Sequence, residues 1–253
     1  MRGVTKQYRG ILLPLLGCVA FAVYWLVFGW QPMNRAELPL AALIHSAAGR
    51  SDSVDGAILF FNRWWGEAVC VVLIYVSFLL VATRSTPGGE DRRRILGFSA
   101  VIFATWVIAN FVGEDLIEPT VVRESPAFLL GDGFTDLAVL HDTKVKVRSA
   151  NSFPSNHGTV FMLVFTMSLY RYGRTAWLLL PVATVLSLPR CFTGAHWVGD
   201  SLVGSLLMTW LISAVVMTTP LRKVVDRIEQ MAMAVLPGWL SGRIAYSPGP
   251  APT

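Results

Sequence analysis

Charged residues and cysteines are both scarce in this 253-residue chain, and each scarcity excludes a class of protein. Only 15% of the residues are charged, against roughly 25% in a typical soluble domain, while 54% are apolar. The cysteines, Cys18, Cys70 and Cys191, are too scattered for a disulfide framework or a metal-binding cluster. The sequence also has no internal repeat. The composition therefore argues against a soluble fold, a disulfide-rich domain and a repeat array.

Apolar runs of membrane-spanning length make up much of the sequence. They predict six spans, at residues 10–30, 65–83, 95–113, 156–172, 175–190 and 198–219. A 19-residue helix rises roughly 28 Å, which matches the hydrocarbon core of a bilayer. Tryptophans at the edges of the runs, such as Trp30 and Trp197, are typical of membrane interfaces. We therefore predict an all-α, polytopic membrane protein, a six-transmembrane helix bundle that forms one integral membrane domain over residues 1–253.

Three segments are expected to lie outside the spans. Residues 34–64 mix apolar patches with Pro and Gly, which predicts amphipathic helices at the membrane interface. Residues 221–240 carry apolar side chains at helical spacing beside basic ones, which predicts an amphipathic helix on the cytoplasmic leaflet. A C-terminal helix packed against the bundle explains that pattern equally well. The Pro-rich tail, residues 247–253, is expected to be disordered.

The distribution of Lys and Arg predicts the orientation of the chain. We attribute the net charge of +5 to the excess of Lys and Arg on the cytoplasmic side of membrane proteins, rather than to nucleic-acid binding. With both termini in the cytoplasm, most of the 21 basic residues lie on that side. Several of the others lie close to two polar motifs, where a phosphate would need cations. They are Arg123, Lys144, Lys146, Arg148 and Arg190.

The first polar motif is Arg190-x5-His196-x3-Asp200, next to the last predicted span. His196 and Asp200 are four residues apart, so their side chains would meet on a helix. A carboxylate bonded to one imidazole nitrogen would fix the tautomer and leave the other nitrogen free to attack phosphorus. The planar guanidinium of Arg190 could hold two phosphate oxygens at once.

The second polar motif, residues 152–157, reads Ser-Phe-Pro-Ser-Asn-His and precedes an apolar run. Ser152 is expected to cap the following helix, with Pro154 in its first turn. Free backbone N–H groups there would form an anion site, and His157 would be placed to donate a proton. Taken alone, the motif could equally be a capped helix with an interfacial histidine. Because both motifs fall on the same predicted membrane face, we favour a site for chemistry on a lipid headgroup. The remaining histidines, His45 and His141, are expected to be interfacial or loop residues.

At these residues the sequence resembles the type 2 phosphatidic acid phosphatase superfamily, whose hallmarks are Pro-Ser-Gly-His and Ser-Arg-x5-His-x3-Asp. The resemblance implies that His196 is a nucleophile that forms a phosphohistidine, that Asp200 orients it, and that His157 is the acid for the leaving group. It further implies that Arg190 and the region of Ser155 bind phosphate, with no metal and no other cofactor.

The likeness covers roughly residues 95–215, which we expect to be the catalytic core, and it is imperfect. Asn156 replaces the usual glycine and Pro189 the usual serine. The family's first motif, Lys-x6-Arg-Pro, is represented only by Arg123-x2-Pro126. One or more further cations would supply the missing charge, unless these residues form a solvated basic strip. The candidates are Lys144, Lys146 and Arg148.

These departures resemble one branch of the superfamily, the lipid A 1-diphosphate synthases, whose patterns this chain repeats at residues 152–158 and 189–200. The resemblance implies transfer of a phosphoryl group from undecaprenyl diphosphate to the 1-phosphate of lipid A or lipopolysaccharide, at the periplasmic face of the inner membrane. A lipid phosphatase acting on undecaprenyl diphosphate or lipid A 1-phosphate is an alternative. A non-catalytic lipid transporter or binding protein is another, although it would favour polar residues in the middle of spans rather than at their ends.

Overall fold

The structure, a computed structural model, describes residues 2–85 and 92–235, and the regular elements of these ranges are all helical. The longer helices are α1 (Arg2–Phe28), α2 (Gln31–His45), α3 (Asp52–Phe61), α4 (Trp64–Ser85), α5 (Arg92–Phe111), α7 (Asn156–Tyr172), α8 (Leu179–Ser187), α10 (Ser205–Thr218) and α11 (Arg222–Val235). The single-turn helices are α6 (Leu137–Leu140) and α9 (Pro189–Phe192). Two π-helical turns are η1 (Val112–Ile117) and η5 (Asp200–Gly204), and three 3-10 segments are η2 (Pro126–Phe128), η3 (Gly131–Gly133) and η4 (Gly173–Leu178). The prediction of an all-α fold is confirmed.

Within the described ranges, five segments are long and apolar enough to cross a membrane. They are Ile11–Phe28, Trp64–Ser85, Arg92–Ile117, Asn156–Phe192 and Asp200–Thr218. The protein is therefore a multi-pass membrane protein. The two spans expected at 156–172 and 175–190 both fall within the fourth of these segments.

That fourth segment folds back on itself. Helix α7 ends at Gly173, whose φ of 60° is a left-handed conformation that glycine adopts without strain. The 3-10 segment η4 then turns the chain into α8, which packs against α7. Because α8 leads to Arg190, which contacts His157 at the start of α7, the two helices run antiparallel. The hairpin returns the chain to the membrane face from which it started.

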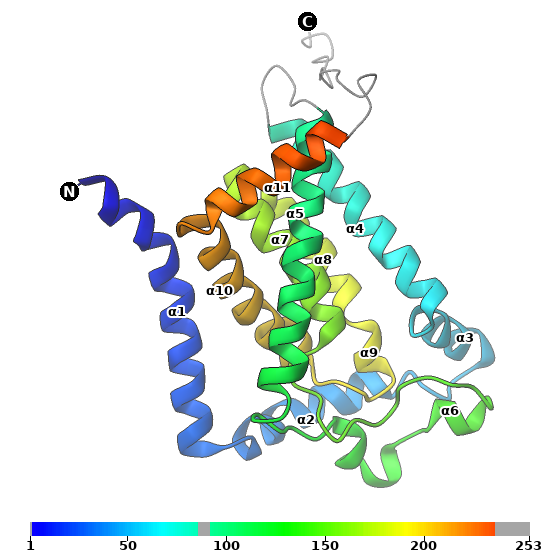
Figure 1. Cartoon of the computed structure of the whole chain (residues 1–253). Helices are drawn as coiled ribbons and strands as arrows, with labels where there is room; N and C mark the ends of the chain where they lie inside the picture. The colour runs from blue at the N-terminus through cyan, green and yellow to red at the C-terminus, as the bar shows by residue number, and fades with distance from the viewer. Residues whose placement is uncertain (1, 86–91, 236–253) are drawn as a thin grey trace, which may run out of the picture.

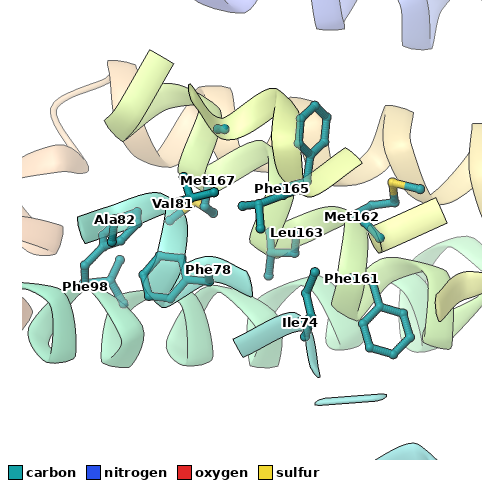
Figure 2. Packing of buried hydrophobic residues seen from close by; sticks show 14 of the residues in the cluster. Ile74, Phe78, Val81, Ala82, Phe98, Phe161, Met162, Leu163, Phe165 and Met167 are labelled. Atoms are coloured by element: carbon teal, nitrogen blue, oxygen red, sulfur yellow. The ribbon is translucent and has the colours of Figure 1, made fainter. Parts of the chain in front are cut away.

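Helix α7 lies at the centre of the apolar core (Figure 2). Its Leu163 and Met167 are fully buried and belong to the same cluster as Phe78 of α4 and Phe98 of α5. Lipid tails are as apolar as these side chains, so hydrophobicity alone does not drive spanning helices together. Close packing and polar contacts between helices must therefore contribute to their association.

Small and hydroxylated residues provide those contacts between α7 and α10. The hydroxyls of Thr166 and Ser213 lie 2.9 Å apart, and the Ser205 hydroxyl donates a hydrogen bond of 3.0 Å to the carbonyl of Ser155. Gly158 allows the closest approach, because a Cβ atom there would lie 2.3 Å from the carbonyl oxygen of Ser201. The start of α7, which carries His157, is thus in close contact with the backbone of η5, whose first residue is Asp200.

The two ends of the bundle differ in what covers them (Figure 1). The N-terminal end of α1 and helix α11 lie at one end, at the top of Figure 1, whereas α2, α3, α6 and α9 lie at the other. Helices α2 and α3 occupy the segment in which interfacial helices were predicted. Helix α1 packs against α10 and leaves apolar side chains such as Leu13 and Leu26 exposed, as a lipid-facing helix would.

Helix α11 corresponds to the first part of the amphipathic helix predicted at 221–240, and it packs along α5. Its buried Glu229 accepts hydrogen bonds of 2.8 and 3.1 Å from Arg171 at the end of α7. Val224 and Met231 remain exposed on another face. Packing against the bundle and an exposed apolar stripe therefore occur together in this helix. Residues 236–240 and the predicted disordered tail, 247–253, lie outside the described residues.

Candidate active site

Helix α9 lies at the same end of the bundle as α2, α3 and α6 (Figure 1), and its Arg190 contacts His157 of α7 there, which brings the two motifs together. His157 lies in the first turn of α7 and Arg190 lies in α9. His196 lies in the loop that connects α9 to η5, and Asp200 is the first residue of η5. The α7–α8 hairpin explains why residues more than 30 positions apart in the sequence come together.

His196 is a buried imidazole with a fixed tautomer. Its Nδ1 donates a hydrogen bond of 2.7 Å to the carbonyl of Ser152, and the residue is only 5% exposed. In the neutral imidazole the lone pair therefore resides on Nε2. Burial lowers the pKa of His196 to about 3, and the nearby charges of Lys146 and Arg190 act in the same direction. His196 is consequently neutral at physiological pH, as a nucleophile must be.

Asp200 does not make the contact that its spacing predicted. The helix begins only at Val198, so His196 lies outside it and the four-residue helical relation does not apply. The carboxylate instead accepts a hydrogen bond of 3.0 Å from the backbone N–H of Trp197 and one of 2.5 Å from Arg123. The Ser152 carbonyl takes the place on the imidazole that we had expected for Asp200. Asp200 therefore holds the backbone beside His196.

Ser155, rather than Ser152, caps α7. The Ser155 hydroxyl accepts a hydrogen bond of 3.4 Å from the N–H of Gly158, and its side chain is fully buried. The Ser152 hydroxyl instead donates to the carbonyl of Arg123 over 2.9 Å. Because the Ser155 side chain is fully buried, the predicted phosphate-binding role of Ser155 would have to come from the backbone of the capped turn.

Arg123 is the centre of a buried ionic network, which we call the buried cluster. Its Nε donates to Asn34 (2.9 Å), Nη1 to Asp200 (2.5 Å) and Nη2 to Glu37 (3.0 Å). Its side chain is fully buried, and the guanidinium lies over two indole rings, those of Trp30 and Trp197. Arg123 was predicted to bind phosphate. With all three nitrogens bonded and no exposed surface, it is positioned to support the loop of His196 instead.

Glu37, a residue that sequence reasoning missed, strengthens that support. Its second oxygen accepts a hydrogen bond of 2.8 Å from the N–H of Gly199. The indole N–H of Trp197 donates to the carbonyl of Glu124 over 2.8 Å. Helix α2 and the segment around Arg123 therefore hold the loop on both sides of Trp197. The distance in sequence between α2 and this loop follows no motif, so it could not predict their contact. The feature that could have pointed to Glu37 is an acidic residue in a helix predicted to lie at the membrane interface.

A second set of charged side chains, which we call the open cluster, consists of Arg190, Glu67 and His157. Arg190 Nη2 donates to Glu67 Oε1 over 2.7 Å, His157 Nε2 lies 2.9 Å from the same oxygen, and Arg190 Nη2 lies 3.4 Å from His157 Nε2. Their side chains are 12%, 35% and 24% exposed, in the order Arg190, Glu67, His157. Within the described chain, the buried Nε of Arg190 has no hydrogen-bond partner. An unpaired buried donor of this kind is what a phosphate oxygen would satisfy.

Glu67 was not predicted, although it is the one acid in the apolar span that α4 forms. It lies in the first turn of α4, which brings it to the same membrane face as the two motifs. An isolated ionisable residue within a spanning helix is costly to desolvate and usually functional, and that was the signal available in the sequence.

Among the three further cations predicted to assist, Lys146 is the one that acts on His196. It contributes to the lowered pKa of His196, and its own pKa is lowered by partial burial despite the opposing charge of Glu118. Arg148 lies over the ring of Phe134, with its guanidinium carbon 5.0 Å from the ring centroid. Lys144 is exposed. Of these three cations, Lys146 is therefore the one with an electrostatic effect on the proposed nucleophile.

His45 and His141 connect the helices and loops at this end of the bundle. His45 is buried, donates to the carbonyl of Phe192 over 3.0 Å and accepts from the N–H of Thr135 over 2.9 Å, and burial lowers its pKa. His141 lies 2.8 Å from a carboxylate oxygen of Asp55. In the part of the chain that the structure describes, no group of three or more His, Cys, Asp or Glu side chains is arranged to hold a metal ion.

A polar cavity of about 240 Å³ lies next to the open cluster and is lined by Glu67, Trp106, Asn110, Asn156 and His157, among others. It shares Val71, Trp106 and Val160 with an apolar groove of about 370 Å³ between α4, α5 and α7. On another side of α4, a second apolar groove of about 500 Å³ is lined by residues of α3, α4, α8 and α9, including Pro189 next to Arg190. The first groove therefore adjoins the cavity beside the open cluster, and the second comes near the site at Pro189.

This arrangement can carry out phosphoryl transfer. A neutral imidazole can attack phosphorus in line with a leaving group, while Arg190 and Lys146 balance the negative charge on the phosphate oxygens. His157, next to both, can supply or accept a proton. The adjoining grooves would hold the apolar part of a lipid substrate.

The sequence is similar to known proteins. The sequence model of the PAP2 superfamily matches residues 99–224 of the chain. Lipid A 1-diphosphate synthase of Escherichia coli (strain K12) is 34% identical to it over 168 residues, which cover 66% of this chain and 68% of that protein. No solved structure gives a significant match.

Proposed function

This chain belongs to the PAP2 superfamily of lipid phosphate phosphatases and phosphotransferases, and we propose from this premise that it is a lipid A 1-diphosphate synthase. The reaction would transfer the terminal phosphoryl group of undecaprenyl diphosphate to the 1-phosphate of lipid A or lipopolysaccharide. Its products would be undecaprenyl phosphate and lipid A 1-diphosphate. The observation that carries the proposal is the 34% identity to the E. coli synthase over 168 residues.

In the proposed first step, Nε2 of His196 attacks the terminal phosphorus of undecaprenyl diphosphate. The bond between that phosphorus and the bridging oxygen breaks, which leaves a phosphohistidine and undecaprenyl phosphate. Arg190 and Lys146 hold the phosphate oxygens. The leaving group is itself a phosphate, whose second pKa is about 6, so it can depart without a proton from His157. A phosphate monoester would instead release an alkoxide and would need that proton.

In the proposed second step, an oxygen of the lipid A 1-phosphate attacks the phosphohistidine. A new phosphorus–oxygen bond forms, the bond from phosphorus to Nε2 breaks, and the neutral imidazole of His196 is restored. Since two anionic groups must meet, the step benefits from cations on both. Arg123 and Asp200 act in this scheme as positioning residues. Any contribution of Ser155, Lys144 and Arg148 to phosphate binding is secondary.

The same proposal includes a topology. The N-terminal end of α1 and helix α11 lie at one end of the bundle, which requires an even number of crossings (Figure 1). Counting α7 and α8 as separate crossings gives six. With the basic residues near α11 in the cytoplasm, the site would face the periplasm from the inner membrane. Residues 95–215 would form the catalytic core of a single membrane domain.

The second apolar groove favours a transferase over a phosphatase. A phosphatase binds one lipid and admits water to the phosphohistidine, whereas a transferase must hold two lipids at once. One groove shares Val71, Trp106 and Val160 with the cavity beside the open cluster, and the other, on a different side of α4, includes Pro189, the neighbour of Arg190 in the chain. Each groove could therefore guide one lipid chain toward the site. A lipid transporter or binding protein would have no use for a buried, neutral histidine beside three cationic or protonatable groups.

The test follows the terminal phosphate of the donor. Undecaprenyl diphosphate labelled at that phosphate is incubated with purified enzyme, with and without lipid A, and the label is measured in lipid A and in free phosphate. We expect most of the label in lipid A. His196→Ala should abolish both products while leaving the protein folded. Equal release of free phosphate with and without lipid A would make the protein a phosphatase, and turnover by His196→Ala would remove His196 from the mechanism.

A further inference from the structure

Glu67 occupies the place at which a phosphate oxygen would be bound. One of its oxygens, Oε1, is within 2.7 Å of Arg190 Nη2 and within 2.9 Å of His157 Nε2. The proposed function assigns Arg190 to the phosphate, and His157 lies directly beside it. A bound phosphate and the Glu67 carboxylate would therefore compete for the same donors.

The structure also contains a second location that could receive this carboxylate. Glu67 lines the polar cavity together with Trp106 and Asn110. Within the described residues, the buried indole N–H of Trp106 and the buried amide oxygen of Asn110 have no hydrogen-bond partners. The Trp106 N–H is a donor that a carboxylate turned into the cavity would satisfy.

We infer that Glu67 is a specificity-determining gate, which covers Arg190 and His157 until a sufficiently charged lipid phosphate displaces it toward Trp106. The inference rests on the proposed function only for the assignment of Arg190 and His157 to the phosphate site. It adds a residue outside both motifs and outside the part of the chain that matches the superfamily, which begins at residue 99.

Competition by a carboxylate explains why such a site would not be blocked by ordinary membrane lipids. Most lipids at a membrane surface are phosphodiesters with a single negative charge, equal to the charge of Glu67. A terminal phosphate carries about two negative charges at neutral pH and a diphosphate carries more, so these ligands displace the carboxylate from Arg190. Discrimination thus comes from a group that opposes the wrong ligand as well as from groups that attract the right one.

The first experiment compares wild type with Glu67→Gln, which keeps the shape of the side chain and removes its charge. Binding of inorganic pyrophosphate is measured by calorimetry, and inhibition of donor turnover is measured with added dioleoylphosphatidylglycerol. We expect Glu67→Gln to bind pyrophosphate about tenfold more tightly and to be inhibited at about tenfold lower phosphatidylglycerol concentration. Weaker or unchanged pyrophosphate binding in Glu67→Gln would overturn the inference, because a residue that only positions Arg190 would give that result.

The binding measurement also separates this inference from the proposed function. It requires neither lipid A nor turnover, so tighter pyrophosphate binding would support the gate even if no label reached lipid A. Arg190→Gln should abolish the difference between Glu and Gln at position 67. A difference that persists in the Arg190→Gln background would place the pyrophosphate elsewhere and overturn the inference.

A second experiment tests the role of Trp106. Trp106→Phe removes the indole N–H, so the displaced carboxylate loses its partner and pyrophosphate should bind about threefold more weakly. In a Glu67→Ala background the same substitution should have no effect, because no carboxylate remains to be received. An equal effect of Trp106→Phe in both backgrounds would show that Trp106 acts independently of Glu67 and would contradict the inference.

Discussion

Two clusters of arginine and carboxylate lie near His196, and they differ in exposure rather than in chemistry. In the buried cluster, Arg123 and Asp200 have fully buried side chains and every nitrogen of the guanidinium is bonded. In the open cluster, Arg190 and Glu67 are partly exposed, and Nε of Arg190 is unpaired among the described residues. The same residue types therefore serve to hold a loop in one place and to receive a ligand in the other.

Each kind of cluster has its own energetic signature. Removing one partner of a buried ion pair leaves an uncompensated charge, at a cost of about 3–5 kcal/mol, whereas replacing both partners with apolar residues is often tolerated. A partly exposed pair contributes only about 0–1 kcal/mol to stability. Stability and activity should consequently separate when the two clusters are altered in turn.

The largest effect is expected for Asp200→Ala in the buried cluster. It leaves the charge of Arg123 unpaired, so the free energy of unfolding should fall by about 3–5 kcal/mol, measured by thermal or denaturant unfolding in detergent. Replacing both partners, Arg123→Met with Asp200→Leu, should recover most of that stability without recovering activity. A double variant as unstable as Asp200→Ala alone would show that the ion pair is not what stabilises this loop.

The open cluster should show the reverse pattern. Arg190→Gln removes a guanidinium that we propose to bind the transferring phosphate, so turnover should fall about 100- to 1000-fold. Its unfolding free energy should change by less than about 1 kcal/mol. A large loss of stability in Arg190→Gln would mean that both clusters are structural, and the contrast between them would fail.

A smaller effect is expected for Lys146→Gln, and its signature is a change in pH dependence. The pKa of His196 is lowered mainly by burial and next by Lys146, so His196 loses activity by protonation only well below pH 6.5. Removing the Lys146 charge raises that pKa, and the acid limb of kcat/KM should move to higher pH. Both proteins are compared on the same donor, so ionisation of the substrate cancels. An acid limb that stays in place would exclude an action of Lys146 on His196.

The smallest effects are expected for Lys144→Gln and Arg148→Gln, which serve as matched charge controls for Lys146→Gln. Lys144 is exposed and Arg148 lies over Phe134, so KM for the donor should change by no more than about twofold in either variant. A larger change in KM for either variant would indicate that the substituted residue takes part in phosphate binding, which the sequence analysis allowed.

Features that depend on a local sequence pattern could be predicted from the sequence, whereas contacts that depend on packing between distant elements could not. Apolar runs identified the spanning helices, and the motif spacings identified Arg190, His157 and His196. The expected contact between Asp200 and His196 failed because the helix begins two residues after His196. Glu37 and Glu67 could not be assigned from spacing, because only the packing of α2 and α4 brings them to the site. The six predicted spans became five apolar segments because a short 3-10 turn joins two of them.

Gly158 has a consequence for how this protein could be altered. A Cβ atom there would lie 2.3 Å from the Ser201 carbonyl oxygen in η5 and 2.5 Å from the Ser205 hydroxyl, so the absence of a side chain at this position sets the spacing between the turn that carries His157 and the segment that follows His196. Gly158 lines neither of the two apolar grooves. In the proposed scheme, the groove walls could therefore be changed for other lipids without altering that spacing, whereas even an alanine at position 158 would push the two motifs apart.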